Sequence, residues 1–181
     1  MRGLKVYAGF LATLLAAAAL LGCAGTGLAT GAAARTAGSP EEFARLGLSP
    51  TVIEPWEDGA RTDGGRGTYE WWYFDFSLDD GSTLVIVFLT KDLTRPQSPL
   101  SPVVTFSLDH PDGDRIERAV TARAAEYTAA KDGCDVRIGA CTASGDLRDY
   151  VVHYEDDEVA ADLRLTATVP SWRPGTGYAF F

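Results

Sequence analysis

Two carboxylates, Glu70 and Asp75, flank a run of four aromatic residues, Trp71–Phe74. A carboxyl group among aromatic rings loses hydration, which raises its pKa and can keep it protonated near neutral pH. The faces of Trp and Tyr rings also stabilise a nearby cation. Glu70 and Asp75 are therefore candidate general acids. The candidate ligand-binding residues are Trp71, Trp72, Tyr73 and Phe74. The alternative is that Glu70 pairs with an arginine such as Arg66 and that the aromatic residues are only core.

The stretch that carries these residues, Thr68–Leu78, is predicted to be a β-strand, in which successive side chains point to opposite faces. This alternation places Glu70 on the face of Trp72, and Asp75 on the face of Tyr73. We therefore expect at most one of the two carboxylates to meet a given ligand. Because both faces carry bulky apolar groups, we also expect the strand to be covered on both sides.

The rest of the chain after residue 68 also has the pattern of short strands. Residues 159–169 alternate apolar and polar side chains, as a half-buried strand does, and sequences such as Asp79–Ser82 indicate hairpin turns. The further predicted strands are Thr83–Thr90, Val103–Leu108, Arg115–Thr121, a short one at Tyr127, Cys134–Gly139, Asp149–Tyr154 and Val159–Val169. Short strands joined by regular hairpins predict an all-β fold, either an antiparallel barrel or a sandwich.

Composition and motifs exclude several functions. The net charge of −9 argues against nucleic acid, whose phosphates require a Lys/Arg footprint. The chain contains no nucleophile elbow, P-loop or dinucleotide fingerprint, so we predict no cofactor. His110 and His153 are interpreted as turn and strand residues rather than members of a catalytic triad. The acidic run Glu155–Glu158 lacks the ligand spacing of a calcium loop, so no metal site is predicted.

The N-terminus resembles a bacterial lipoprotein signal. Arg2 and Lys5 precede the uncharged apolar run Val6–Leu21, and Cys23 follows directly after Gly22. We therefore expect a signal peptide at residues 1–22, a lipid on Cys23, and an exported protein anchored to the bacterial cell membrane. The alternatives are an ordinary signal peptide with an incidental cysteine, or an uncleaved anchor.

Three segments are expected along the chain. The signal peptide is followed by a flexible tether at residues 23–52, which is rich in small residues and includes a possible short helix at Pro40–Leu46 capped by Ser39. Residues 53–181 form the predicted β domain. The chain ends on two phenylalanines with no polar tail, which we interpret as the end of a fragment.

Export would place Cys134 and Cys141 in an oxidising compartment, where cysteines can pair. Their separation suits a bridge across a tight hairpin. The closed loop is short, so the stabilisation would be at the low end of the usual ~2–4 kcal/mol. The alternative is that both cysteines are free, buried thiols.

The segment Tyr69–Phe74, followed by the turn Leu78–Gly81 and an apolar strand, resembles the carotenoid 1,2-hydratase family. This family is also described as hydroxyneurosporene synthase-like or AttH-like. The resemblance extends from about Glu54 to the end of the chain, but only the Glu-Trp-Trp-Tyr-Phe sequence is specific. Many relatives have a small residue and a histidine after the aromatic run, where this chain has Asp75-Phe76-Ser77.

The resemblance implies a lipocalin-like domain that is the first of two β-rich halves, so that a missing second half would cover the second face of the central strand. It also implies a hydratase-like enzyme that protonates a double bond of an apolar isoprenoid or polyene from Glu70 or Asp75. The alternative is a non-catalytic, lipid-anchored protein that binds a hydrophobic small molecule.

Overall fold

The structure, a computed structural model, describes residues 35–180, which belong to two compact units. In the smaller unit, β1 (Arg35–Thr36) pairs antiparallel with β11 (Ala179–Phe180). The larger unit, Gly38–Thr176, contains all the other described elements. The predicted signal peptide and Cys23 lie outside the described residues.

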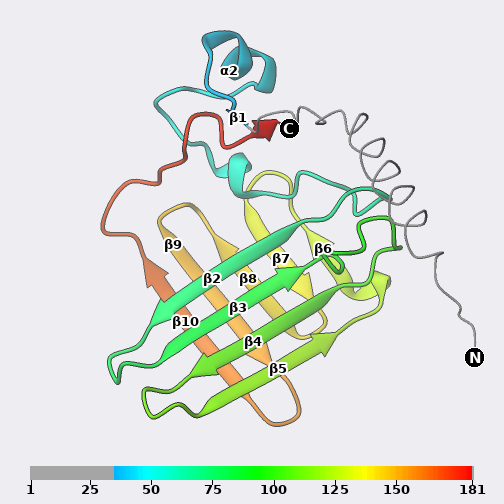
Figure 1. The fold of residues 1–181 in the computed structure, drawn as a ribbon, viewed down its shortest axis with the longest axis vertical. Helices are drawn as coiled ribbons and strands as arrows, with labels where there is room; N and C mark the ends of the chain where they lie inside the picture. Colours follow the sequence, from blue (N-terminus) through cyan, green and yellow to red (C-terminus); the bar gives the residue numbers. More distant parts are fainter. Residues whose placement is uncertain (1–34, 181) are drawn as a thin grey trace, which may run out of the picture. The chain divides into compact units, whose positions relative to one another are not determined.

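Two antiparallel sheets form two layers in the larger unit (Figure 1). The four-stranded sheet contains, in spatial order, β2 (Trp71–Ser77), β3 (Thr83–Leu89), β4 (Val103–Asp109) and β5 (Arg115–Thr121). The five-stranded sheet contains β10 (Ala160–Thr166), β9 (Asp149–Glu155), β8 (Cys141–Gly145), β7 (Cys134–Ile138) and β6 (Tyr127–Ala129). The strands of one layer cross those of the other steeply, as in orthogonally packed sheets. Within the described residues the sheets remain separate and do not close into a barrel, so the all-β prediction is confirmed and its sandwich alternative describes the fold.

Within each of these two sheets, every strand pairs with the strands that precede and follow it in the sequence, so the connections are β-hairpins. Most of these connections are short turns, and the one between β3 and β4 is a longer loop. Several of these turns contain a glycine with a positive φ, which other residues adopt at a cost. Gly81 has a φ of 85° between β2 and β3, and Gly139 has a φ of 60° between β7 and β8. The turn predicted at Asp79–Ser82 is therefore confirmed.

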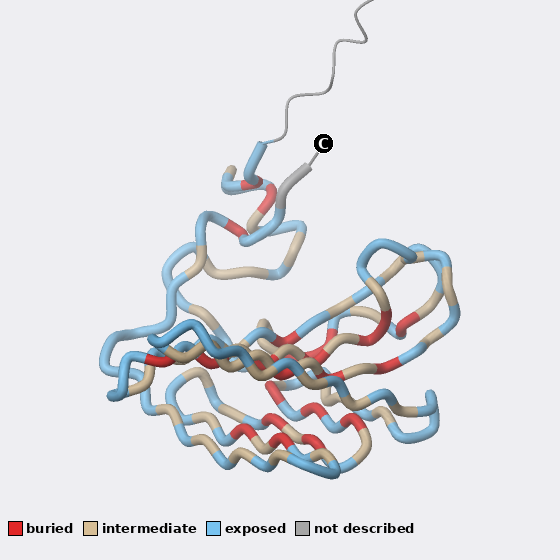
Figure 2. Tube along the Cα trace, turned by 60° about the horizontal axis from the view of Figure 1, so that its bottom comes forward, coloured by how far each residue is buried: buried red, intermediate tan, exposed pale blue. Residues whose placement is uncertain are grey.

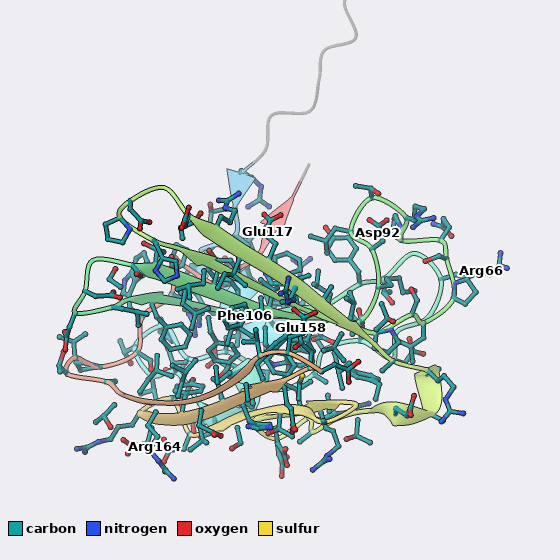
Figure 3. All side chains as sticks on the ribbon, turned by 90° about the horizontal axis from the view of Figure 1, so that it is seen from below. Arg66, Asp92, Phe106, Glu117, Glu158 and Arg164 are labelled. Atoms are coloured by element: carbon teal, nitrogen blue, oxygen red, sulfur yellow. The ribbon has the colours of Figure 1, made fainter. Side chains whose placement is uncertain are left out.

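The core lies between the two layers, where alternate side chains of the central strands are buried and those of the edge strands β5, β6 and β10 are only partly buried (Figure 2). On β3, the inward residues Leu84, Ile86 and Phe88 are buried. Phe106 of β4 meets Tyr154 of β9 with a ring-centroid distance of 4.9 Å. Figure 3 shows Phe106 between the sheets, whereas the side chain of Arg164 on β10 points away from them.

Three strands differ clearly from the prediction. Strand β2 begins at Trp71 rather than at Thr68, so Glu70 lies directly before it. Strand β8 was not predicted, because its sequence, Cys-Thr-Ala-Ser-Gly, is small and partly polar; its pairing with β7 and β9 on either side keeps it extended. Strand β10 ends at Thr166 rather than at Val169. The last main-chain hydrogen bond of this pair runs from the Ala167 N–H to the Arg148 carbonyl, directly before the first residue of β9.

Among the described residues β2 is covered on one face only, whereas the sequence-based prediction assigned the cover of its other face to a further β-rich half. Trp72 on the inner face is 6% exposed, but Trp71 and Tyr73 on the outer face are 47% and 55% exposed. The five-stranded sheet packs on only one side of the four-stranded sheet. An aromatic outer face therefore remains accessible on this strand.

The predicted disulfide is also wrong, because Cys134 and Cys141 are free and buried. Cys134 lies opposite Gly145 and Cys141 lies opposite Ile138, so the two thiols are at opposite ends of the β7–β8 pair. Four residues along a strand span ~13 Å, whereas a disulfide requires Cα atoms within ~7 Å. Burial, with a smaller effect of the nearby Asp58 carboxylate, raises the pKa of Cys134 to about 12.

The predicted short helix is confirmed as α2 (Pro40–Leu46), with Ser39 and Glu42 forming a capping box. Residues 38–52 nevertheless belong to the larger unit and are not part of a separate tether. Arg173 holds this segment, because it donates a hydrogen bond of 2.6 Å to the Ser49 carbonyl and lies over the Phe43 ring.

Two short 3₁₀ helices are also present, η1 (Pro55–Asp58) and η2 (Ala124–Glu126). Among the described residues there is no helix with the length and apolar character needed to cross a membrane.

Candidate functional site

A cleft of about 480 Å³ lies along the free edge of β2. This edge is open because β2 pairs only with β3. The lining residues come from η1 and the loop after it, from β2, and from β9 and β10; they are Glu57, Asp58, Gly59, Arg61, Glu70, Trp71, Trp72, Tyr73, Phe74, Asp75, Tyr150 and Leu165. The volume is within the range of small-molecule sites, ~300–1,000 Å³.

All of the predicted catalytic and ligand-binding residues line this one cleft. Both Glu70 and Asp75 are thus in the lining of one cleft, whereas the sequence led us to expect at most one of them to meet a given ligand. Side chains do alternate along β2, with Trp72 and Phe74 directed inward and Tyr73 directed outward. However, the cleft follows the edge of the strand, and residues from both of its faces reach that edge.

Asp58 is a site residue that the sequence did not reveal. Its carboxylate accepts a hydrogen bond of 2.6 Å from the Tyr150 hydroxyl, and its carbonyl accepts one of 3.1 Å from the Trp72 indole N–H. Burial raises the pKa of Asp58, while the Tyr150 hydrogen bond and the charge of Arg61 act in the opposite direction. Asp58 is thus a carboxyl in the cleft whose affinity for a proton is increased by its surroundings.

The absence of a side chain at Gly145 on β8 gives Tyr150 the space to reach Asp58. A Cβ atom at Gly145 would overlap the Tyr150 ring. The same ring meets Phe74 at a centroid distance of 6.2 Å, which joins the two walls of the cleft. Asp58 and Tyr150 are 92 positions apart in the chain. No local sequence pattern connects them, so only the fold reveals the pair.

Glu70 is held by neutral donors instead of by Arg66. Its carboxylate accepts hydrogen bonds from the main-chain N–H of Arg61, from the Thr62 N–H at 3.2 Å and from the Thr62 hydroxyl at 3.1 Å. Arg66 is exposed and points away from its loop (Figure 3). Asp75 is exposed, and its carboxylate makes no hydrogen bond or ion pair with the other described residues. Asp75 is therefore not the buried acid that was predicted.

A buried lysine fixes the loop that supports Glu70. Lys91 is fully buried, and its ammonium group donates hydrogen bonds to the main-chain carbonyls of Gly64 and Gly65, both at 2.8 Å, and of Ser98 at 2.9 Å. These bonds connect the loop before β2 to the loop after β3. The position of Thr62, and through it the Glu70 carboxylate, depends on this connection.

The histidines lie away from the cleft. His110 is paired with Ser82 in the turns at the ends of β3 and β4, with 3.1 Å between its Nδ1 and the hydroxyl oxygen. On β9, the Nδ1 of His153 lies 2.8 Å from Asp162 on β10. The described residues include no group of His, Cys, Asp and Glu side chains placed to hold a metal ion.

Comparisons with protein-family models, with curated proteins and with solved structures find no match to this chain. The function is therefore inferred from the cleft itself.

Proposed function

We propose that the sandwich binds a small molecule with an apolar body in the cleft along β2. The proposal rests on the volume of the cleft together with the aromatic residues that line it. A cleft of about 480 Å³ has aromatic walls, including the accessible faces of Trp71 and Tyr73. A ligand that covered these faces would remove apolar surface from water, which favours binding by ~25 cal/mol per Å². The Asp58–Tyr150 pair would supply a polar group that orients the ligand.

An acyclic terpenoid alcohol such as geraniol is a suitable first ligand. Binding by the full 181-residue chain would be followed by calorimetry and by tryptophan fluorescence, because Trp71 and Trp72 line the cleft. We expect Tyr73→Ala to weaken binding about 10-fold, since covering a half-exposed aromatic ring contributes ~1–2 kcal/mol. Leu93→Ala is the control, because Leu93 is also exposed but lies outside the cleft. Equal affinities for the two variants, or no saturable binding, would contradict the proposal.

A hydratase-like enzyme is a second candidate, and the raised pKa of Asp58 beside aromatic rings favours it. In this reaction the protonated carboxyl of Asp58 transfers its proton to one carbon of a double bond. The cation that forms on the other carbon is stabilised by the aromatic faces. Water then adds to that carbon and returns a proton to the Asp58 carboxylate, so that the net change is the addition of one water molecule.

Mass spectrometry distinguishes the two candidates. If the protein is a hydratase, a terpenoid with a terminal double bond gains the mass of one water, and Asp58→Asn abolishes the gain. Glu70→Gln and Asp75→Asn test the two acids predicted from the sequence, and we expect both variants to retain activity. If saturable binding occurs without a mass gain, the enzyme candidate is wrong while the binding proposal stands.

We also propose that the chain is exported and anchored by a lipid on Cys23. The support is the sequence pattern alone, with a positive start, an apolar run and a cysteine after Leu-Leu-Gly. A bacterium that expresses the full chain should incorporate labelled palmitate into the protein and carry it in the membrane fraction. The Cys23→Ser variant should lose the label, and a labelled variant would refute the proposal.

A further inference from the structure

The charges that line the cleft are unbalanced. The cleft contains four carboxylates and one guanidinium group, that of Arg61. One carboxylate, Glu57, forms an ion pair of 2.6 Å with Arg173, in which both side chains are largely buried. Among the described residues, no ion pair neutralises Asp58, Glu70 or Asp75. The donors that reach the first two are the Tyr150 hydroxyl and the groups around Thr62, all of them uncharged.

Arg61 offsets this excess only in part, because it is a single positive charge among the lining residues. Its guanidinium donates hydrogen bonds to the carbonyls of Gly59 at 3.0 Å and Lys131 at 3.1 Å, and it lies 4.8 Å from the centre of the Trp56 ring. It therefore contacts main-chain oxygens and an aromatic face rather than a carboxylate. Since unlike charges attract even at a partly solvated surface, the cleft favours a positively charged occupant over a neutral or negative one.

The aromatic residues of the cleft suit the same kind of occupant. Trp71 and Tyr73 have accessible ring faces, and Trp71 is stacked on Tyr69 with a centroid distance of 5.5 Å. An ammonium group is attracted to the face of a Trp or Tyr ring. Carboxylates combined with aromatic faces are thus a common chemistry for the recognition of organic cations.

The free edge of β2 adds hydrogen-bond acceptors. Main-chain bonds flank β2 at both ends, from the Thr90 N–H to the Glu70 carbonyl at 3.0 Å and from the Leu78 N–H to the Ser82 carbonyl at 2.8 Å. The register between them is unbroken, so the even-numbered residues of β2 are the ones that bond to β3. In an antiparallel pair the alternate residues direct their N–H and C=O groups to the other side. The carbonyl groups of Trp71, Tyr73 and Asp75 therefore face the open edge, where a protonated amine with N–H donors could bond to them.

We propose that the ligand of this cleft is an organic cation, an apolar chain that ends in a protonated primary amine. This inference rests on the proposed binding function and specifies its ligand class. The ammonium group lies among the carboxylates and edge carbonyls, and the apolar chain covers the rings of Trp71 and Tyr73. No covalent step is involved.

The experiment compares three probes with the same apolar chain, namely octylamine, 1-octanol and octanoate. At about pH 7 the amine is a cation and octanoate is an anion. Calorimetry with the full chain should give an affinity for octylamine at least about 10-fold higher than for octanol, and octanoate should bind least. The preference should decrease as the salt concentration rises, because salt screens partly exposed charges.

Single substitutions test whether the preference for octylamine arises in the cleft. Asp75→Asn should weaken octylamine binding about 2- to 5-fold, which is the range for a partly exposed charge pair, and should leave octanol binding unchanged. Asp157→Asn is the matched control, because it removes an exposed carboxylate outside the cleft.

If octylamine and octanol bind equally, the cation inference is wrong while the binding function stands. If no probe binds, the binding function itself fails. If octylamine binds but Tyr73→Ala and Asp75→Asn have no effect, the cleft is not its site and the inference is overturned.

Discussion

Replacing Lys91 with methionine should destabilise the sandwich by about 3 kcal/mol. The change keeps most of the side-chain volume but removes the ammonium group, which is fully buried and donates to three carbonyls at 2.8–2.9 Å. Each hydrogen bond from a charged donor contributes ~1.5–3 kcal/mol, and the cost of removing the ammonium from water offsets several kcal/mol of their sum. The carbonyls of Gly64, Gly65 and Ser98 would lose this partner.

Urea unfolding of the full chain, followed by tryptophan fluorescence, measures this loss. A loss of ~3 kcal/mol in a domain of this size corresponds to a decrease in melting temperature of ~6–12 °C. Lys131→Met is the control, since the Lys131 side chain is exposed, and its effect should remain within ~0.5 kcal/mol. If Lys91→Met is as stable as the wild-type chain, the ammonium group does not connect the two loops in the way described.

A second measurement separates the role of the charge from that of the side-chain volume. Lys91→Ala should leave an empty space bordered by the carbonyls of Gly64, Gly65 and Ser98. Ammonium chloride should restore part of the stability of this variant, because NH₄⁺ can donate to the same oxygens. Tetramethylammonium chloride at the same concentration should not, because that ion has no N–H donor. Equal effects of the two salts would show that the carbonyls do not select a donor.

Three further predictions concern groups with altered pKa values or buried thiols. Tyr150→Phe should raise the pKa of Asp58 further, because it removes a hydrogen bond that stabilises the carboxylate, and a carboxyl-sensitive NMR titration would show a decrease if this reasoning is wrong. The hydrogen bond with Asp162 raises the pKa of His153 above its usual value. The stabilisation of the folded state by this pair is therefore complete below about pH 6.5 and is lost as the pH rises through the pKa of His153 in the folded protein. His153→Gln should therefore be less stable than wild type at low pH, by under ~1 kcal/mol because the pair is near the surface, and equally stable at high pH in urea unfolding; a pH-independent difference would contradict this. Cys134 should react with iodoacetamide only after unfolding, as located by peptide mass mapping, since it is buried with a pKa of about 12.

Local patterns were sufficient for much of the fold. The alternation of apolar and polar residues predicted most of β10, a continuous β-branched and apolar run predicted β3, and Gly81 marked the turn that follows β2. These features depend on residues that are neighbours in sequence, so the sequence records them directly. Strand β8 was missed because small, mixed side chains have no strong preference of their own. In that strand, pairing on both sides decides the conformation, and pairing is a property of the whole sheet.

The candidate site was predictable only where it lies on one strand. The aromatic residues of β2, its carboxylate Asp75 and the carboxylate Glu70 directly before it could be identified from their spacing. The Asp58–Tyr150 pair could not, because it joins residues 92 positions apart. The buried position of Lys91 was also unexpected, since a lysine is usually solvated. Its burial depends on carbonyls that two separate loops supply.

The location of β2 at the edge of its sheet explains why the prediction for Glu70 and Asp75 was incomplete. In a central strand such as β3, both edges are bonded to neighbours, and a ligand can approach only one face at a time. On an edge strand, a ligand that lies along the free edge reaches the inner face, the outer face and the main-chain groups between them. Residues of opposite orientation can then contact the same molecule. On such an edge strand, two side chains that point to opposite faces can therefore belong to the same binding site.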